Sequence, residues 1–99
     1  MREIVEKLNK VFDNRIRLAV MSALSVNDSI NFNALKEMLN VTDGNLASHV
    51  AALEEAGYLK VIKKFVGRKP QTTYTLTAAG RKAFTDHIDA LEKLIKNSQ

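Results

Sequence analysis

The chain has 99 residues and a mass of 11.0 kDa, which fits one domain with a single core and is too short for an enzyme with separate cofactor and substrate domains. Hydrophobic residues (45%) and charged residues (26%) occur in proportions that exclude wholesale disorder, and no apolar run approaches the roughly 18 residues of a membrane span. The absence of cysteine excludes a disulfide framework, a zinc–thiolate site and a thiol nucleophile. The charged N-terminus has no signal-peptide core, so we expect a cytoplasmic protein with no membrane partner.

The formal net charge is +4, from 15 basic and 11 acidic residues. Five of these bases and none of the acids lie between Leu59 and Gln71, so this segment carries the positive excess of the chain. A basic segment on a near-neutral body indicates a surface that faces a polyanion. The alternative is a solvated, lysine-rich hairpin that only protects the edge of a sheet.

The spacing of apolar residues predicts a mainly helical α+β chain. Residues suited to cap a helix precede four of the predicted helices, namely Asp13 or Asn14, Asn33, Thr42 and Thr77, and Gly57 is suited to end one. In chain order the expected elements are helices over residues 2–12 and 14–24, a strand over 30–32, helices over 34–39 and 43–56, strands over 58–66 and 72–76 joined by a polar loop at 67–71, and a helix over 77–96.

Two short helices with a tight link, followed at once by a basic hairpin, predict a winged helix-turn-helix in a single domain over residues 1–99. The helix-turn-helix covers about residues 33–57 and the hairpin, or wing, about 58–76, with additional helices at both ends of the chain.

Three stretches carry a resemblance to known proteins: NRIRLAVMSAL, FNALKEMLNVTDGNLASHVAALEEAGYL and KKFVGRKPQTTYTLTAAGR. In their order and spacing they resemble the winged-helix transcriptional regulators of bacteria and archaea, of the MarR/ArsR-like kind. The resemblance implies a small, stand-alone DNA-binding regulator without a separate ligand domain. The metal sensing of many ArsR-like members depends on cysteines, so it is not carried over to this chain.

The helix that follows Thr42 is the candidate for reading DNA, because its outward face is small and polar. Its expected DNA-facing residues are Thr42, Asn45, Ser48 and His49, opposite the apolar stripe of Leu46, Val50 and Leu53. Asparagine and histidine can bond base edges, serine can bond a base or a phosphate, and free N–H groups at the helix start suit a phosphate. The alternative is a helix face that is merely solvated.

This helix contains no lysine or arginine, so charge must come from elsewhere. The wing is the expected source, through Lys63, Lys64, Arg68 and Lys69. Arg68 and Lys69 are predicted at the loop tip, within reach of a minor groove or phosphates, whereas Lys63 and Lys64 are consecutive in a strand and must point to opposite faces. Arg15 and Arg17 either add phosphate contacts or are simply solvated.

The sequence offers no support for catalysis or for a cofactor. Ser48 and His49 diverge by about 100° on a helix, so they cannot form a nucleophile–base pair. His49 and His87 do not form a metal-binding pair on one helix face, and we expect both to be solvated. We therefore expect a protein that is not an enzyme.

The terminal helices, over residues 2–12 and 77–96, carry apolar stripes that predict a homodimer. The expected interface residues are Ile4, Leu8, Phe84, Ile88, Leu91 and Ile95. Such a dimer suits a near-palindromic operator in double-stranded DNA. The alternative for the last helix is that it packs only within its own chain.

A winged-helix module that binds another protein is the rival function. The predicted binding face is polar and basic and lacks the aromatic anchors of a protein hot spot, which favours DNA. The operator sequence, the regulated genes, the sign of regulation and the existence of a small-molecule effector stay open.

Overall fold

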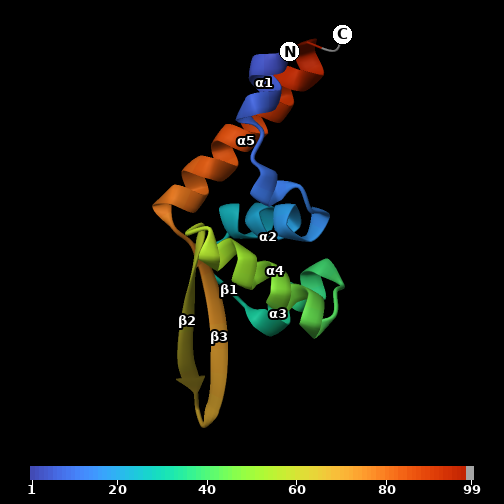
Figure 1. Cartoon of the computed structure of the whole chain (residues 1–99). Coiled ribbons are helices and arrows are strands. Elements are labelled where there is room, and N and C mark those ends of the chain that lie inside the picture. Colours follow the sequence, from blue (N-terminus) through green and yellow to red (C-terminus); the bar gives the residue numbers. More distant parts are fainter. Residues whose placement is uncertain (98–99) are drawn as a thin grey trace.

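The computed structural model describes residues 1–97 and confirms the predicted winged-helix architecture (Figure 1). The described elements are α1 (Arg2–Lys7), the short 3-10 helix η1 (Lys10–Phe12), α2 (Arg15–Ser25), β1 (Ile30–Asn31), α3 (Phe32–Leu39), α4 (Asp43–Glu55), β2 (Leu59–Val66), β3 (Lys69–Leu76) and α5 (Ala78–Asn97). No helix within residues 1–97 combines the length and the hydropathy that crossing a bilayer requires.

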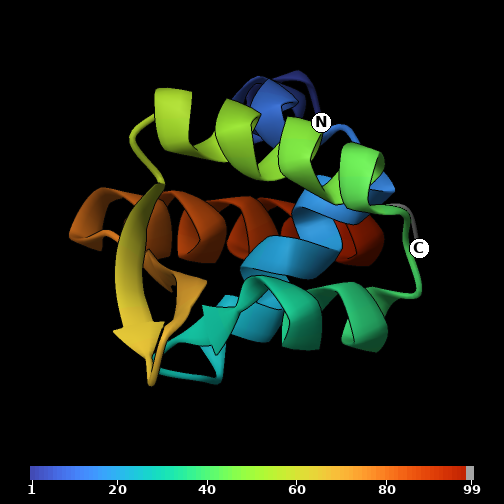
Figure 2. The same cartoon turned by 90° about the horizontal axis from the view of Figure 1, so that it is seen from below.

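The molecule is elongated, with extents of 54 × 25 × 21 Å. The β2–β3 hairpin projects from one end of a helical body, and α5 with α1 beside it projects from the other (Figure 1). Seen along this long direction, α3 and α4 lie on either side of α2 (Figure 2). The body therefore separates two extensions, which we call the wing (β2, β3 and their turn) and the arm (α1 and the second half of α5).

The core lies where α2, α3 and α4 meet the base of the sheet. Its largest fully buried side chains are Met21, Leu24, Leu35, Leu46, Leu53 and Val20. The predicted inward stripe of α4 is confirmed, because Leu46 and Leu53 are fully buried and Val50 is 5% exposed. This packing fixes which face of α4 is turned to solvent.

The sheet is antiparallel with the strand order β1-β3-β2. The prediction of a five-residue wing loop is wrong, because β2 and β3 are joined by a turn of only Gly67 and Arg68. Gly67 has a φ of 65°, which a two-residue hairpin turn requires at its first position and which glycine adopts without strain. Pro70 is tolerated in β3 because β1 pairs only with Thr73 and Tyr74, so β3 is an edge strand at Pro70.

The predicted continuous helix over residues 2–12 is also wrong. Helix α1 stops at Lys7, Leu8 is extended, and Asn9 starts η1 by accepting a hydrogen bond from the N–H of Val11. Asn9 also donates from its backbone N–H to Nδ1 of His87 at 3.0 Å and from its side chain to the hydroxyl of Tyr58 at 2.9 Å. These long-range bonds break the helix, so that Phe12 enters the core while α1 lies along α5.

Of the predicted caps, Asn14, Thr42 and Thr77 are confirmed, since each side chain accepts a hydrogen bond from a backbone N–H in the first turn of its helix. The prediction of Asn33 as a cap is wrong. Asn31 caps α3 instead, with its side-chain oxygen 2.8 Å from the N–H of Ala34, and the short strand therefore ends at Asn31.

His87 is not solvated, contrary to the sequence prediction. It is 4% exposed, and its ring lies 5.1 Å from that of Phe12 in an edge-on contact. Burial lowers the pKa of His87 below the ordinary 6.5, and the nearby charge of Asp13 only partly opposes this shift. A neutral ring is also what the hydrogen bond from Asn9 requires, because Nδ1 must accept.

The free energy of unfolding is therefore expected to fall as the pH drops below about 6.5. Above this pH the His87 ring is neutral in both states; below it the unfolded chain binds the proton more readily than the folded chain, until the pH passes the lowered pKa. Urea unfolding at pH 7.5 and pH 5.5 measures this difference. In His87→Gln the difference should shrink, and an equal pH dependence in both proteins would exclude His87 as its source.

Candidate nucleic-acid interface

Helix α4 presents a short polar face at its N-terminal end. The hydroxyl oxygen of Thr42 accepts the N–H of Asn45 at 3.2 Å and so fixes the first turn. The side chains of Asn45 and Ser48, three positions apart on the same side of the helix, are exposed. A face of this kind can approach base edges without steric obstruction.

The N-terminal end of α4 has charged neighbours that the sequence pattern did not reveal. The carboxylate of Asp43 forms an ion pair with Lys36 of α3, with Nζ of Lys36 2.7 Å from Oδ1 of Asp43. The positive charge of Lys36 reduces the repulsion between this carboxylate and an approaching phosphate. Arg15, at the start of α2, lines one hollow together with Thr42 and Asn45. Tertiary packing therefore supplies a cation beside a helix that contains none.

His49 and Arg17 face each other instead of pointing independently to solvent. Nη1 of Arg17 lies 3.3 Å from Nδ1 of His49, and Nε of Arg17 donates to the carbonyl of Val11 at 2.6 Å. Both residues are half-buried. Because arginine only donates, Nδ1 of His49 accepts, and the ring proton of a neutral His49 is then on Nε2. The structure thus gives an intramolecular partner both to His49, a predicted DNA contact, and to Arg17, for which the sequence left a phosphate contact and simple solvation open.

Lys63 and Lys64, two of the three lysines of β2, lie on opposite faces of the wing, as predicted. Lys63 pairs with Thr72 in the sheet register and lines a hollow against Ala47 and Ala51 of α4. Lys64, the next residue, is on the other face. Arg68 occupies the turn itself and Lys69 is the first residue of β3, so both remain at the end of the wing.

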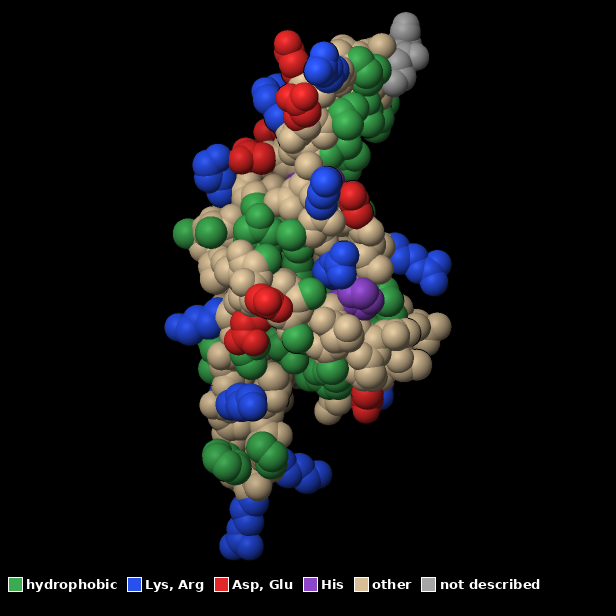
Figure 3. All heavy atoms as spheres, viewed as in Figure 1, with side chains coloured by type: hydrophobic (Ala, Val, Ile, Leu, Met, Phe, Trp, Pro, Cys, Tyr) green, Lys and Arg blue, Asp and Glu red, His purple; other side chains and the backbone are tan. Residues whose placement is uncertain are grey.

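The end of the wing is also apolar, which the sequence analysis missed. Basic and hydrophobic side chains lie side by side there in Figure 3. Phe65 is 73% exposed and Val66 is 57% exposed. The expectation that the binding surface lacks aromatic side chains is therefore wrong at the wing.

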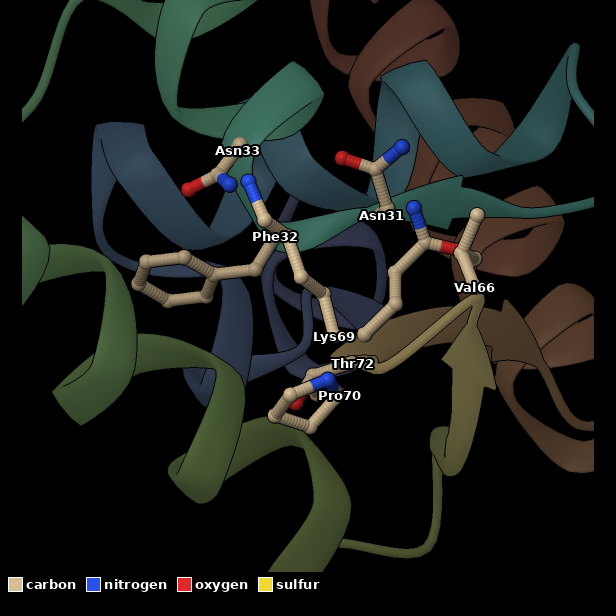
Figure 4. Close-up of a pocket in the computed structure, with 8 residues that line it drawn as sticks. Asn31, Phe32, Asn33, Val66, Lys69, Pro70 and Thr72 are labelled. Atoms are coloured by element: carbon tan, nitrogen blue, oxygen red, sulfur yellow. The ribbon is translucent and has the colours of Figure 1, made fainter.

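Another hollow, with a mixed polar and apolar lining, lies between the start of α3 and the wing (Figure 4). Asn31 and Asn33 lie on one side of it, and Pro70 and Thr72 of β3 lie on the other. Sequence reasoning did not find this hollow, because the β1–β3 pairing brings together residues that are about 40 positions apart. Its amide and hydroxyl groups suit the oxygens of a phosphate backbone.

The residues predicted for a dimer fall into two groups, because some of them pack within their own chain and others are exposed. Phe84 packs edge-on against Phe12 of its own chain, with ring centroids 6.0 Å apart, and Ile4 lines a hollow together with Ala90 of α5. Leu8 and Leu91 are half-buried, whereas Ile88 and Ile95 are exposed.

No group of three His, Asp or Glu side chains that could hold a metal occurs within residues 1–97.

Comparison with known proteins agrees with this geometry. Residues 16–95 match the family described as the winged helix DNA-binding domain. An uncharacterized protein of Methanocaldococcus jannaschii is 36% identical over 88 residues, which cover 89% of this chain and 96% of that protein.

Two solved structures are similar over nearly the whole chain. The transcriptional regulator homologue of Pyrococcus horikoshii has a TM-score of 0.87 and 26% identity, with 99% of this chain and 95% of that chain covered. The MepR chain of an S. aureus MepR–DNA complex has a TM-score of 0.75 at 15% identity, with 100% and 82% covered, and shows the fold alone. The chain therefore belongs to the winged helix DNA-binding domain family, and its sequence resemblance to winged-helix transcriptional regulators is confirmed.

Proposed function

We propose that this chain, acting as one winged-helix domain, is a sequence-specific, double-stranded DNA-binding transcriptional regulator that works as a homodimer. The observation that carries the proposal is the exposed polar face of α4 beside a wing in which five bases and no acid lie between Leu59 and Gln71. An operator-bound dimer would act sterically, by blocking or helping polymerase. Two similar structures, one of a transcriptional regulator homologue and one of a protein bound to DNA, support the same function.

In the proposed complex, the N-terminal half of α4 enters the major groove. Asn45 is suited to bond adenine through both atoms of its amide, and Ser48 to bond a base or a phosphate. Thr42, Arg15 and the free N–H groups of the first turn would contact the phosphate backbone, and His49 would donate from Nε2 while Arg17 holds its other nitrogen. The wing would supply charge through Lys63, Lys64, Arg68 and Lys69, toward phosphates or a minor groove.

The exposed apolar residues of the arm support the proposal of a dimer. Ile88 and Ile95 are 40% and 62% exposed on one stripe of α5, with Leu91 between them. Apolar side chains also gather toward this end of the molecule in Figure 3. Pairing the stripe with its equivalent in a second copy would bury it, with Ile4, Leu8 and Phe84 at its margin. Two-fold symmetry would then present two α4 helices to major grooves about 34 Å apart on a near-palindromic operator.

The charge of the wing is tested by Arg68→Ala combined with Lys69→Ala. Binding to the selected operator and to random DNA should weaken alike, because phosphate contacts carry no sequence information. The slope of log K against log salt should flatten by about one to two units if both cations contact phosphates. The matched control removes two cations from α5, by Lys82→Ala with Lys96→Ala. An unchanged slope in the wing variant would contradict the assignment of the wing to DNA.

The reading of bases is tested by Asn45→Ala on an operator enriched from randomised DNA. Loss of a base contact should cost on the order of 1–3 kcal/mol on the operator and little on random DNA. Asn97→Ala, the same change at the end of α5, serves as the control. Equal losses on both DNAs would show that Asn45 contacts only phosphate, and failure of the wild-type protein to enrich any motif would contradict sequence specificity altogether.

A further inference from the structure

The end of the wing exposes large apolar side chains that the proposed phosphate contacts do not use. From Ile62 to Val66 every residue of β2 is exposed, because this half of the strand projects past the helical body. Phe65 is the most exposed aromatic residue among the large hydrophobic side chains of the described chain, at 73%. Phe65 and its neighbour Val66, 57% exposed, place apolar surface together at the end of a narrow hairpin, and an apolar patch of this kind indicates an external partner.

The sheet register decides in which direction Phe65 points. Directly opposed residues of an antiparallel pair share a face, and Phe65 is opposed to Pro70. Two residues closer to the body, Lys63 and Thr72 form a pair on the same face, and both line the hollow against α4. Phe65 and Pro70 therefore lie at the outer end of the wing face that is turned to α4, whereas Val66 is on the opposite face.

The charges around Phe65 restrict the kind of partner. Lys63 lies on the same face of the wing as this pair, and Arg68 is in the adjoining turn. Lys64 and Lys69 lie on the opposite face of the same hairpin, and no acid occurs between residues 59 and 71. This combination of cations and an apolar side chain complements DNA, whose phosphates attract the cations and whose base steps accept an apolar group. Phenylalanine and proline are among the side chains that enter the minor groove as wedges and partly unstack a base step.

We propose that Phe65, supported by Pro70, is an apolar wedge that enters the minor groove next to the major groove read by α4, and there unstacks a base step and bends the duplex. The proposal rests on the proposed function and adds a mode of recognition to it. Sequence preference at this site would come from the deformability of the step, since pyrimidine–purine steps kink most easily. A wedge of this kind contributes no phosphate contact.

The test uses the full-length protein and its selected operator, labelled at both ends for energy transfer and carrying 2-aminopurine at flanking pyrimidine–purine steps. The wild-type protein should shorten the end-to-end distance and raise the 2-aminopurine fluorescence. Phe65→Ala should abolish both signals and weaken binding about tenfold, the scale of one lost stacking contact, with an unchanged salt slope. Phe65→Leu should retain most of both signals.

Val66→Ala is the matched control, because it shortens an exposed apolar neighbour on the other face of the wing. The wedge is refuted if Phe65→Ala bends and unstacks the operator like the wild type, or if Val66→Ala loses the signals equally. It is also refuted if Phe65→Ala changes only the sedimentation of the free protein, because Phe65 would then bind another copy. A wild-type protein that binds duplex without bending it refutes the wedge alone, whereas one that binds no duplex refutes the proposed function as well.

Discussion

Leu91→Glu combined with Ile95→Glu is expected to produce a folded monomer that has lost most of its affinity for the operator. Both residues lie on the apolar stripe of α5, which is only partly covered within a single chain. Placing two carboxylates in an apolar seam costs much more than placing them in water, so the dimer should dissociate. Losing the second reading helix removes the gain from bivalent binding, and the affinity should fall by about a hundredfold or more.

Sedimentation and operator binding measure the two effects, and circular dichroism checks the fold. The control is again Lys82→Ala with Lys96→Ala, which changes the net charge by the same two units on the same helix while leaving the stripe intact. The proposed dimer fails if the wild-type protein is monomeric at micromolar concentration and still binds the operator tightly.

Gly80→Ala is expected to destabilise the fold, although alanine is normally the better residue inside a helix. A Cβ at Gly80 would collide with the backbone of Tyr58, chiefly with its carbonyl oxygen. That carbonyl accepts the N–H of Thr77 at 3.1 Å, and the Thr77 hydroxyl donates to the carbonyl of Gly57 at 2.6 Å while accepting the N–H of Gly80. The start of α5 and the link from α4 to β2 are therefore held together at one point.

Alanine normally favours a helix over glycine by about 1 kcal/mol, so any net loss at Gly80 must come from this collision. Overpacking against backbone costs about 1–3 kcal/mol, and the urea midpoint should fall accordingly. Gly44→Ala is the matched control, since a Cβ at Gly44 in α4 meets no atom within 4 Å and should raise the midpoint slightly. Measurements at one protein concentration keep the comparison free of dimer effects. A midpoint unchanged in Gly80→Ala would show that the helix can shift away from Tyr58.

The same contacts explain part of the sequence resemblance. In the stretch TYTLTAAG, Thr77 is needed because one hydroxyl both caps α5 and bonds Gly57, and Gly80 is needed because the helix passes against the Tyr58 backbone. A short pattern of this kind reflects a close packing of backbone that larger residues would prevent.

Local sequence determined the elements whose ends and faces depend on near neighbours. The stripe of Leu46, Val50 and Leu53 fixes the buried face of α4 through the helical repeat alone, and so also the face that Asn45 and Ser48 present. Thr42 caps its own helix, and Gly57 ends it with a φ of 81°, because both effects act within one turn. The concentration of positive charge in the wing is likewise a property of thirteen consecutive residues.

Tertiary structure decided everything that depends on partners distant in the chain. Asn9 breaks the first helix because it forms hydrogen bonds with Tyr58 and His87, which are 49 and 78 positions away. The spacing of apolar residues within residues 2–12 cannot reveal hydrogen bonds to partners so distant in the chain. His87 is buried for the same reason, and His49 meets Arg17 only because α4 packs on α2. The direction of Phe65 follows from its pairing with Pro70 and from the position of the wing relative to α4. Backbone hydrogen bonds and side-chain packing act between whatever surfaces the folded chain brings together, whereas propensity and periodicity act only along it.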